Sequence, residues 1–386
     1  MNIAIVGCGY VSDFYLQTLP NHPELKIRGV FDRDPIRLAR FSQRNGLSAY
    51  RDFESVLEDR SVDIVVNLTN PKSHYEVSKA CLEAGKHVYS EKPLGMSLAE
   101  IRELTAISLA TGVRMACAPC NLLSESAQTM WRHLREGRIG RVRLAYAELD
   151  DGMVHKAAYR NWISESGSPW PFKNEFETGC TLEHADYYLT WLCAFFGPAK
   201  RLTAFSSIQI PDKTAEVAAA DMAPDFSVGC IEFDNGVVAR LTCGIVAPGD
   251  HSIRIIGDDG VLTVSESWDF GSPVRLRAMP HGLPGRIASR VEREIKRRSP
   301  AFMLTRNLPL ARPARFKRPT AFPMDFARGV AELGAAIRAD RPCRLSPEFC
   351  MHVAELTLVL QNPELYARPY AVESRFDPIQ PMDWAA

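Results

Sequence analysis

The sequence lacks the features that would place it in a membrane or on a nucleic acid. No segment approaches the ~18 consecutive apolar residues that a membrane span requires. Lys and Arg number 46, and Asp and Glu also number 46, so the whole chain has no charge excess that favours a polyanionic partner. The first residues hold neither a basic segment nor an apolar run of signal-peptide length, so we expect a cytoplasmic protein. No recognition motif accompanies the charged residues, and we expect no nucleic-acid partner.

The ten cysteines are most simply reduced, small, buried side chains. Cys117 and Cys120 have dithiol spacing and follow the strand-like run 113–116. The chain around them is neither thioredoxin-sized nor thioredoxin-ordered, so we interpret the pair as a turn at a strand end. No second pair lies at a matching distance, and we expect no metal site.

What the sequence does have is the composition of a globular protein, with 46% hydrophobic and 24% charged residues. Its 386 residues are more than one ordinary hydrophobic core accommodates, so the length favours two domains. Strand-like and helical runs alternate through the first third, which predicts a parallel sheet in an α/β fold. The strands are expected at 2–6, 27–31, 62–68, 87–90 and 113–116, and the later helices at 73–84 and 98–111.

A glycine-rich turn follows the first strand in a way that is typical of dinucleotide binding. It reads GCGYVS at 7–12 and leads into a helical pattern. Gly7 allows the tight turn, and Gly9 lets the backbone approach a pyrophosphate. The N–H groups at the helix start, including those of Tyr10 and Val11, then face that anion.

The second strand ends at Asp32, about 20 residues beyond the glycine turn, where a carboxylate accepts hydrogen bonds from the adenosine ribose. Its charge repels a 2′-phosphate, so we expect NAD rather than NADP. Arg33 favours NADP instead, because a guanidinium there can pair with a 2′-phosphate. Ser12 replaces the third glycine of the pattern, at a position where a small residue often suffices for helix packing.

Ligands of such parallel sheets lie outside the carboxyl ends of the strands. In this chain those ends carry the glycine turn, Asp32 and the segments 67–71 and 91–93. We expect the chemistry to gather there.

The segment 84–94 reads AGKHVYSEKPL, and 69–74 reads TNPKSH. Farther on lie FDNG at 233–236 and IGDDG at 256–260. Together these motifs resemble the glucose–fructose oxidoreductase, inositol dehydrogenase and rhizopine-catabolism (Gfo/Idh/MocA) family, whose T-P-N loop is matched with Pro and Asn exchanged. The resemblance covers essentially the whole chain, and it is highly specific for the family but not for the substrate.

The resemblance implies a Rossmann NAD-binding domain over residues 1–120 and a C-terminal α/β domain over 121–386. The second domain of the family has a large, mostly antiparallel open sheet, whose free face commonly forms homodimers or homotetramers. The pattern of this chain agrees, with strand-like runs at 143–149, 201–210, 226–233, 237–244, 252–256 and 261–264 and helical patterns at 323–339 and 347–361. Cofactor contacts are implied for Thr69, Asn70, His74, Glu91 and Lys92.

Lys92 occupies the position of the family's conserved lysine. A lysine at the carboxyl end of a strand, beside a cofactor, can hydrogen-bond a substrate hydroxyl or carbonyl, and partial burial lowers its pKa toward a usable range. The alternative is a lysine paired with Glu91 at a surface turn. A cis bond before Pro93 would aim the Lys92 side chain.

The segment 179–192, GCTLEHADYYLTWL, resembles a family helix that carries an Asp-x-x-x-His pair. Aligning its flanks places Glu183 on the Asp and Tyr187 on the His, and positions i and i+4 share one helix face. We predict that Tyr187 exchanges a proton with the substrate, because a phenol near Lys92 can have a lowered pKa. His184 lies on the adjacent stripe, and a shift of register would make it the reacting group instead.

Substrate contacts are expected from two other places. The Arg-Phe or Arg-Tyr pair that the family often has after the last Rossmann strand is replaced by Cys120 and Asn121, and the Asn121 amide is a candidate contact. Trp162 and Lys173 lie in a polar, Pro-containing loop before the catalytic helix and are candidates for contacts with a sugar. Loop residues that only cap the second domain are the alternative.

We predict an NAD(P)-dependent oxidoreductase that transfers a hydride between nicotinamide and a secondary hydroxyl or ketone. The substrate is expected to be a sugar, a sugar derivative such as a nucleotide-sugar, or a cyclitol. Lys92 polarises the oxygen, Tyr187 relays the proton, and Glu183 orients the pair. Two alternatives stay open: NAD-dependent glycoside cleavage by transient oxidation and elimination, and a non-catalytic NAD-binding sensor or scaffold.

Residues 273–318 form a basic, Pro-containing insert with 13 Lys and Arg against two Glu. Within it, Ile287, Val291 and Ile295 recur at helical spacing. A solvated arm or a subunit-interface segment is the main interpretation. The other is a surface that gathers anionic substrates, such as nucleotide-sugars, acidic saccharides or lipid-linked intermediates near a membrane surface.

Overall fold

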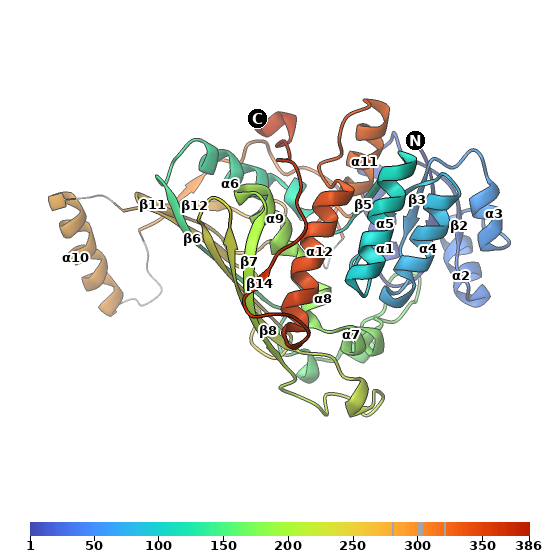
Figure 1. Ribbon diagram of the computed structural model, residues 1–386, viewed down its shortest axis with the longest axis horizontal. Helices are drawn as coiled ribbons and strands as arrows, with labels where there is room; N and C mark the ends of the chain where they lie inside the picture. The colour runs from blue at the N-terminus through green and yellow to red at the C-terminus, as the bar shows by residue number, and fades with distance from the viewer. Residues whose placement is uncertain (280–281, 299–303, 320–321) are drawn as a thin grey trace.

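A computed structural model describes residues 1–279, 282–298, 304–319 and 322–386, and these residues form two β-sheets (Figure 1). The first sheet has five parallel strands in the order β2-β1-β3-β4-β5. These strands are β1 (Asn2–Val6), β2 (Lys26–Phe31), β3 (Ile64–Asn67), β4 (His87–Ser90) and β5 (Met115–Cys117). Residues of β1, β3, β4 and β5 are almost all buried, as in a parallel sheet covered on both faces.

Helices with regular capping residues connect these strands. They are α1 (Ser12–Thr18), α2 (Pro35–Asn45), α3 (Phe53–Glu58), α4 (Pro71–Glu83) and α5 (Leu98–Thr111). The Asp34 carboxylate accepts the N–H groups of Ile36 and Arg37 at the start of α2, and Ser97 caps α5 in the same way. Because these helices connect strands that are all parallel, the carboxyl ends of the five strands lie at the same edge of the sheet.

The second sheet has nine strands in the order β13-β12-β11-β10-β6-β9-β8-β7-β14. Its strands are β6 (Val142–Asp150), β7 (Ala199–Ser207), β8 (Phe226–Phe233), β9 (Val238–Gly244), β10 (Ile253–Gly257), β11 (Gly260–Val264), β12 (Val274–Ala278), β13 (Arg306–Leu308) and β14 (Tyr370–Ala371). Among the described strands, β6 and β9 pair in parallel and the other neighbours are antiparallel. The predicted fold class is confirmed.

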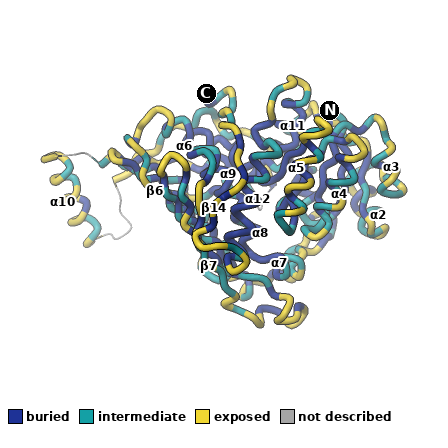
Figure 2. The backbone as a smooth tube through the Cα atoms, in the orientation of Figure 1, coloured by how far each residue is buried: buried dark blue, intermediate teal, exposed yellow. Residues whose placement is uncertain are grey.

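Helices cover one face of the second sheet and leave the other face open (Figures 1 and 2). The remaining helices are α6 (Glu125–Arg135), α7 (Phe172–Thr178), α8 (Cys180–His184), α9 (Asp186–Phe196), α10 (Gly282–Arg298), α11 (Arg328–Arg338) and α12 (Pro347–Gln361). Helices α8 and α12 pack directly on the covered face. The homodimer or homotetramer expected through the open face stays a prediction.

Helix α12 joins the two sheets. It packs against α5 and β5 on one side and against β7, β8 and α9 on the other. Helix α11, which also comes from the last part of the chain, packs against β4 and β5. Helices from the C-terminal part of the chain thus cover part of the first sheet. The division into domains over residues 1–120 and 121–386 stays a prediction.

Two predicted elements differ from the structure by three residues or more at one end. The helix predicted at 323–339 begins at Arg328, five residues late. The strand predicted at 201–210 ends at Ser207. The Asp225 carboxylate accepts the two N–H groups at positions 209 and 210, at 2.6 and 3.0 Å, so these groups are satisfied by a side chain instead of a neighbouring strand.

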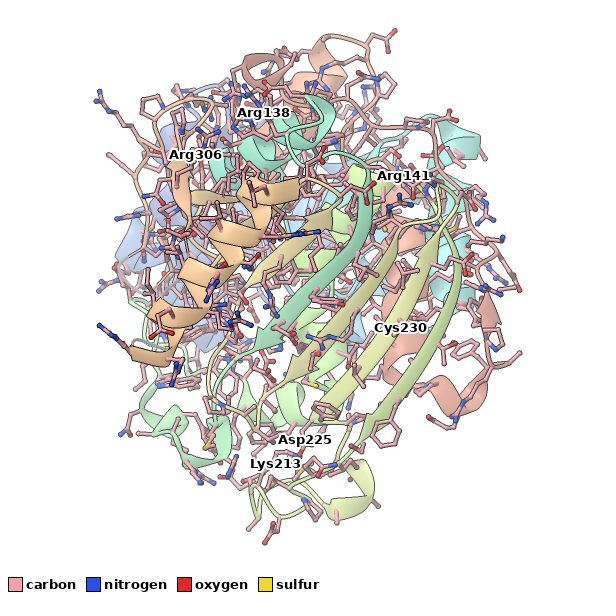
Figure 3. All side chains as sticks on the ribbon, turned by 90° about the vertical axis from the view of Figure 1, so that its left-hand side faces the viewer. Arg138, Arg141, Lys213, Asp225, Cys230 and Arg306 are labelled. Atoms are coloured by element: carbon pink, nitrogen blue, oxygen red, sulfur yellow. The ribbon has the colours of Figure 1, made fainter. Side chains whose placement is uncertain are left out.

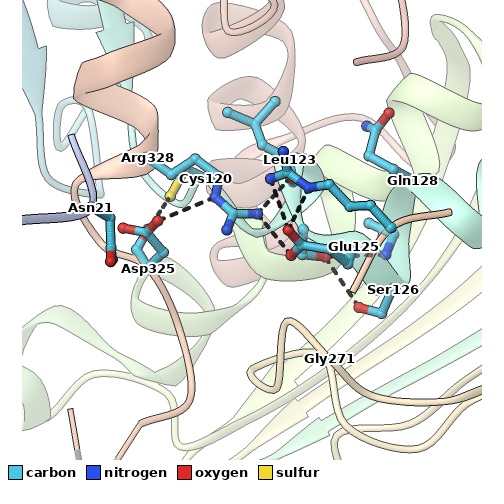
Figure 4. A network of polar contacts seen from close by, with 12 residues as sticks. Asn21, Cys120, Leu123, Glu125, Ser126, Gln128, Gly271, Asp325 and Arg328 are labelled. Carbon is cyan, nitrogen blue, oxygen red and sulfur yellow. Dashed lines mark hydrogen bonds and ion pairs between the residues drawn. The ribbon is translucent and has the colours of Figure 1, made fainter. Parts of the chain in front are cut away.

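A buried ionic network ties the first residues of α6 to the segment before α11 (Figure 4). The Arg328 guanidinium donates to the Glu125 carboxylate at 2.9 Å and contacts the Asp325 carboxylate at 3.4 Å. Arg312 reaches the other oxygen of Glu125 at 2.8 Å, and His22 lies 3.0 Å from Asp325. Because the charges are buried and mutually paired, the loss of one leaves its partners uncompensated.

We expect Arg328→Met to lower the free energy of unfolding by about 3–5 kcal/mol, since it leaves the Glu125 and Asp325 carboxylates buried without their shared cation. Denaturant unfolding followed by circular dichroism measures the change. The control is Arg143→Met, which removes an exposed bidentate pair with Asp258 and should cost about 0–1 kcal/mol. Equal effects of the two substitutions would contradict a special role for the buried network.

Candidate active site and cofactor cleft

A cavity of about 1070 Å³ lies at the carboxyl ends of the parallel strands and extends to the helices of the second sheet. All predicted site residues except Asn121 line it. They are Gly7, Gly9, Tyr10, Val11, Asp32, Arg33, Thr69, Asn70, His74, Glu91, Lys92, Trp162, Lys173, Glu183, His184 and Tyr187. Residues far apart in the chain therefore meet in one chamber, as expected for a ligand site outside the strand ends.

The glycine turn is held by its own side chains and by the second strand. Gly7 has a φ of +98°, and a Cβ at this position would collide with the Leu68 carbonyl. The Ser12 hydroxyl donates to the Gly7 carbonyl at 2.7 Å, so the residue that replaces the third glycine closes the turn. The Cys8 N–H donates to the Asp32 carboxylate at 2.8 Å, which joins the turn to the end of β2.

The same turn leaves room for a dinucleotide. A Cβ added to Gly9 would meet no atom within 4 Å, and Gly9 faces the cavity. The buried amide oxygen of Asn70, also at the cavity, has no hydrogen-bond partner among the described residues. Asp32 is buried, and its free acceptor capacity suits ribose hydroxyls, although Arg37 already contacts it at 3.4 Å. The residues present fit NAD.

Arg37 was not singled out in the sequence. It is the third residue of α2, lines the cavity and faces Asp32, so its position follows from the strand–helix turn rather than from any motif. Arg33 also lines the cavity.

His74 and the loop after β3 hold the segment that follows β4 and carries Lys92. The two ring nitrogens of His74 lie 2.7 Å from the Pro93 carbonyl and 3.0 Å from the Thr69 carbonyl. Burial lowers the pKa of His74, and the contacts with the two carbonyl oxygens offset this lowering only in part. The peptide bond between Lys92 and Pro93 is cis, as expected. His74 thus braces the loop around the cavity.

Lys92 and Glu183 form a direct ion pair across the cavity. Their side chains are only 15% and 5% exposed. Burial lowers the pKa of Lys92, but the carboxylates of Glu183 and Glu175 raise it more, and the net pKa lies well above the ordinary value. The lowered pKa expected from partial burial alone is therefore wrong. The lysine is a firmly charged cation at the cavity wall.

The Glu91 carboxylate is not the partner of the lysine ammonium. It accepts a hydrogen bond from the Tyr15 hydroxyl at 2.7 Å and from the backbone N–H of Lys92 at 3.1 Å. The alternative of a Lys92–Glu91 pair at a surface turn is wrong, since the ammonium points to Glu183 instead.

Tyr187 lies beside this pair, on the face predicted from the i, i+4 spacing. Helices α8 and α9 follow each other with a single residue, Ala185, between them, and the Tyr187 ring packs on Trp268 with centroids 5.3 Å apart. Burial raises the pKa of Tyr187, and the Lys92 ammonium offsets the rise only in part. The expected lowering is not found, so the phenol is neutral in this state.

His184 faces another part of the cavity. Its Nδ1 lies 3.0 Å from the Cys180 carbonyl, which can only accept, so Nδ1 carries the proton and Nε2 is a free acceptor. Nε2 lies 3.7 Å from the Asp151 carboxylate. Burial, with Lys92 and His251 nearby, lowers the pKa of His184 to about 3. The ring is therefore neutral at ordinary pH.

Asn121 does not line the cavity. Its amide N–H donates to the Tyr187 carbonyl at 2.9 Å, and Thr190 donates to its oxygen at 3.4 Å. The prediction of a substrate contact is not supported by this placement. The amide instead fixes the first turn of α9, which carries Tyr187.

Several cavity residues carry titratable groups that sequence reasoning missed. Asp151 follows the end of β6, and burial raises its pKa to about 6. Glu175 in α7 faces the same space, and burial together with the Glu183 carboxylate raises its pKa well above the ordinary value. Asp151 stands at a strand end, which is the signal that could have found it. Glu175 has no comparable signal.

The loop at 162–170 closes the cavity against the glycine turn. The Asp13 carboxylate accepts the Ser166 N–H at 2.8 Å and the Ser166 hydroxyl at 2.5 Å. Trp162 and Trp170 pack edge to face with centroids 4.9 Å apart and line the cavity. Lys173 lies at the cavity too, with its ammonium 3.0 Å from Glu216.

The Cys117–Cys120 pair shows no dithiol geometry. The Cys117 thiol contacts the Glu91 carbonyl and the Cys120 thiol contacts the Asp325 carbonyl. Burial raises the pKa of both thiols, which disfavours the reactive thiolate. Among the residues that the structure describes, no group of three or more His, Cys, Asp or Glu is arranged to hold a metal ion.

Comparison with known proteins agrees with this geometry. Residues 1–118 match the oxidoreductase family with an NAD-binding Rossmann fold, and residues 127–263 match the GFO/IDH/MocA C-terminal domain. The chain belongs to the Gfo/Idh/MocA oxidoreductase family. As a member it is an NAD(P)-dependent oxidoreductase.

The oxidoreductase is similar to trans-1,2-dihydrobenzene-1,2-diol dehydrogenase of Mus musculus, with 25% identity over 68% of this chain and 74% of that protein. Two solved structures share its fold. The aldose-aldose oxidoreductase from Caulobacter crescentus, complexed with glycerol, has a TM-score of 0.71 at 16% identity, over 93% of this chain and 96% of that one. An oxidoreductase from Agrobacterium radiobacter in complex with NAD⁺, L-tartaric acid and magnesium has a TM-score of 0.74 at 14% identity, over 96% and 98%.

Of the helices in the described ranges, none has the length and apolarity needed to cross a bilayer.

The glycine turn generates a direct test of cofactor binding. Gly9→Ala should change the free energy of unfolding by less than about 1 kcal/mol, because the added methyl group meets only empty space. It should weaken NAD binding about tenfold or more, because it occupies the approach of the pyrophosphate. Titration calorimetry with NAD measures the affinity. Gly249→Ala, at an exposed glycine outside the cavity, is the control, and equal NAD affinity in both variants would contradict the assigned site.

The histidine geometry predicts a distinct nuclear magnetic resonance signature. His184 should remain the neutral Nδ1–H tautomer from about pH 5 upward, because its pKa is lowered and it binds a proton only near the acid end. His251 is the internal contrast. Burial lowers its pKa, but the hydrogen bond to Glu266 more than compensates, so it should titrate above the ordinary histidine value. A His184 signal that titrates near neutrality would overturn the assignment.

Proposed function

We propose that this oxidoreductase transfers a hydride between nicotinamide and a secondary hydroxyl or ketone of a sugar, a sugar derivative or a cyclitol, with NAD favoured over NADP. The observation that carries the proposal is the Lys92–Glu183 ion pair beside Tyr187 at the wall of the dinucleotide cavity. When bound, NAD supplies the group that accepts or donates the hydride. The protein residues have to bind the substrate oxygen, hold its charge and move one proton.

Lys92 suits the first task. Its ammonium remains charged at ordinary pH, because the Glu183 and Glu175 carboxylates raise its pKa. A charged donor within a mostly buried site stabilises the negative charge that develops on a substrate oxygen in either direction of the reaction. Glu183 holds the ammonium in place and is the positioning residue of the pair.

Tyr187 suits proton transfer better than His184. The neutral phenol is a proton donor for an oxygen that is gaining charge, which is the requirement when a ketone is reduced. In the oxidising direction the same phenol has to give up its proton first, and the neighbouring Lys92 ammonium lowers the cost of that step. His184 is a weaker candidate, since its low pKa makes Nε2 a poor base.

The substrate class rests on the polar and aromatic lining of the cavity and on its relatives. Trp162 and Trp170 offer faces on which a sugar ring can stack, and Glu175 and Asp151 offer oxygens for hydroxyl groups. The relatives named above act on a dihydrobenzenediol and on an aldose, both of which carry hydroxyl groups. Lys173 also lines the cavity with a half-exposed side chain, and it is the candidate for a contact with a substituent of the sugar, for which a nucleotide-sugar is the extended case.

The test compares turnover and NAD binding in single variants, with NADH production measured over a panel of sugars, sugar derivatives and cyclitols. Lys92→Met and Tyr187→Phe should each lower kcat by about a hundredfold to ten-thousandfold, as expected for loss of an oxygen-binding cation or an acid–base group. NAD affinity should change little in Tyr187→Phe. His184→Gln should lower kcat by less than about tenfold.

Lys72→Met is the matched control, since Lys72 also lines the cavity and pairs with a glutamate but is 61% exposed. It should retain the wild-type kcat. Full turnover by Lys92→Met would end the proposal. Glycoside cleavage without net NADH formation would replace it by the elimination reaction, and catalytic silence of the wild type on every carbinol, with NAD bound, would favour a sensor.

A further inference from the structure

Helix α10 in the basic insert 273–318 stands apart from the rest of the molecule. It lies beyond the open face of the nine-stranded sheet, at the opposite end of the long axis from the Rossmann sheet (Figure 1). Most of its residues are exposed or half-buried (Figure 2). Residues 280–281 and 299–303 of the insert lie outside the described residues. No α10 residue lines the dinucleotide cavity, so the helix serves another purpose than the chemistry there.

One stripe of α10 faces the protein and fixes the orientation of the helix. The less exposed positions of α10 form this stripe, and they are Gly285, Ala288, Glu292, Ile295 and Lys296, which recur at intervals of three or four residues along one side of the helix. The Glu292 carboxylate is buried and accepts a hydrogen bond from Arg277 of β12 at 2.5 Å. Lys296 lies 3.2 Å from the other carboxylate oxygen. This contact holds the stripe against the sheet edge.

Two further stripes therefore face away from the protein. The first is apolar, with Leu283, Ile287 and Val291 at successive intervals of four and 69%, 57% and 46% exposed. The second is basic and runs beside the first. It consists of Arg286, Arg290, Arg293 and Arg297, at intervals of four, three and four, and all four are exposed.

The surroundings of α10 carry the same charge. Arg138, Arg141 and Arg306 lie on the side of the molecule that α10 occupies (Figure 3), and all three are exposed. Leu304, just before β13, is 45% exposed. A second copy of this chain that presented the same face would bring arginines against arginines, which is unfavourable. The complementary partner is anionic.

We propose that α10 is an interfacial helix that docks this oxidoreductase on an anionic lipid bilayer. The arginine stripe lies at the height of the phosphate groups, and the apolar stripe enters the boundary between headgroups and acyl chains. A single convex helix with three apolar side chains in a row forms no pocket for a folded partner, whereas a fluid bilayer adapts to it. Attraction and insertion act together, so binding is peripheral and reversible.

The test is sedimentation of the full chain, with NAD bound, on vesicles of pure phosphatidylcholine and on vesicles in which about a third of the lipid is phosphatidylglycerol. We expect at least about tenfold more protein on the anionic vesicles, and release as the salt concentration rises. Two variants should lose the binding: Arg286→Gln/Arg290→Gln/Arg293→Gln/Arg297→Gln, and Leu283→Ser/Ile287→Ser/Val291→Ser. The first removes the attraction and the second removes the insertion.

A charge-matched control replaces four exposed arginines elsewhere, as Arg44→Gln/Arg51→Gln/Arg102→Gln/Arg338→Gln. It should bind the anionic vesicles like the wild type, and all three variants should retain NAD affinity, which shows that they fold. Equal loss of binding in the control would reduce the effect to net charge and overturn the proposal. Failure of the wild type to bind anionic vesicles would also overturn it. A change of mass in sedimentation velocity that only the α10 variants show would overturn it too, because it would mean that α10 contacts a second copy of the chain. None of these outcomes depends on which substrate is turned over.

Discussion

The ion pair between Lys92 and Glu183 joins the end of β4 to helix α8 across the cavity, between residues 91 positions apart. Burying two charges costs desolvation free energy, which their attraction offsets only when the surrounding structure holds them in good geometry. On the lysine side, His74 and Glu91 bond the backbone near Lys92. The pair therefore links the end of a Rossmann strand to a helix of the second sheet across the cavity that both residues line.

On the glutamate side, helix α12 does the holding. The Gln361 amide donates to the Thr178 carbonyl and accepts the Leu182 N–H at 3.2 Å, on both sides of the start of α8. Gly179 lies against this amide with a φ of +98°, and a side chain there would collide with it. The glycine that opens α8 is thus needed for close approach as well as for its φ. Since α12 also packs on α5 and β5, one helix contacts both the segment that carries Glu183 and the sheet whose strand β4 leads to Lys92.

Local pattern predicted much of this arrangement from the sequence. The strands at 87–90 and 226–233 and the helices at 98–111 and 347–361 have the predicted bounds, because each is a clear run of one period between turn residues or caps. The glycine turn, the i, i+4 relation of Glu183 and Tyr187 and the cis bond were also within reach. Contacts between segments that are far apart in the chain could not be predicted from the sequence. The Asp13–Ser166 contact, the cavity position of Glu175 and the inward turn of Asn121 depend on packing that no local period records. The direction of the Lys92 pKa shift was missed for the same reason, since it depends on how many carboxylates surround the ammonium.

The electrostatics of the two ends of the molecule argue against one interpretation of the basic insert. The Glu175, Glu183 and Asp151 carboxylates lie around the Lys92 ammonium in the cavity, so a strongly anionic group that approached Lys92 would meet carboxylates. An arginine stripe that gathers anionic substrates would serve such a site poorly, and α10 lies at the far end of the molecule from it (Figure 1). Attraction between exposed charges also fades beyond about 10 Å at ordinary ionic strength. The arginines of α10 therefore act on what they touch, which agrees with the proposed contact of this helix with a bilayer.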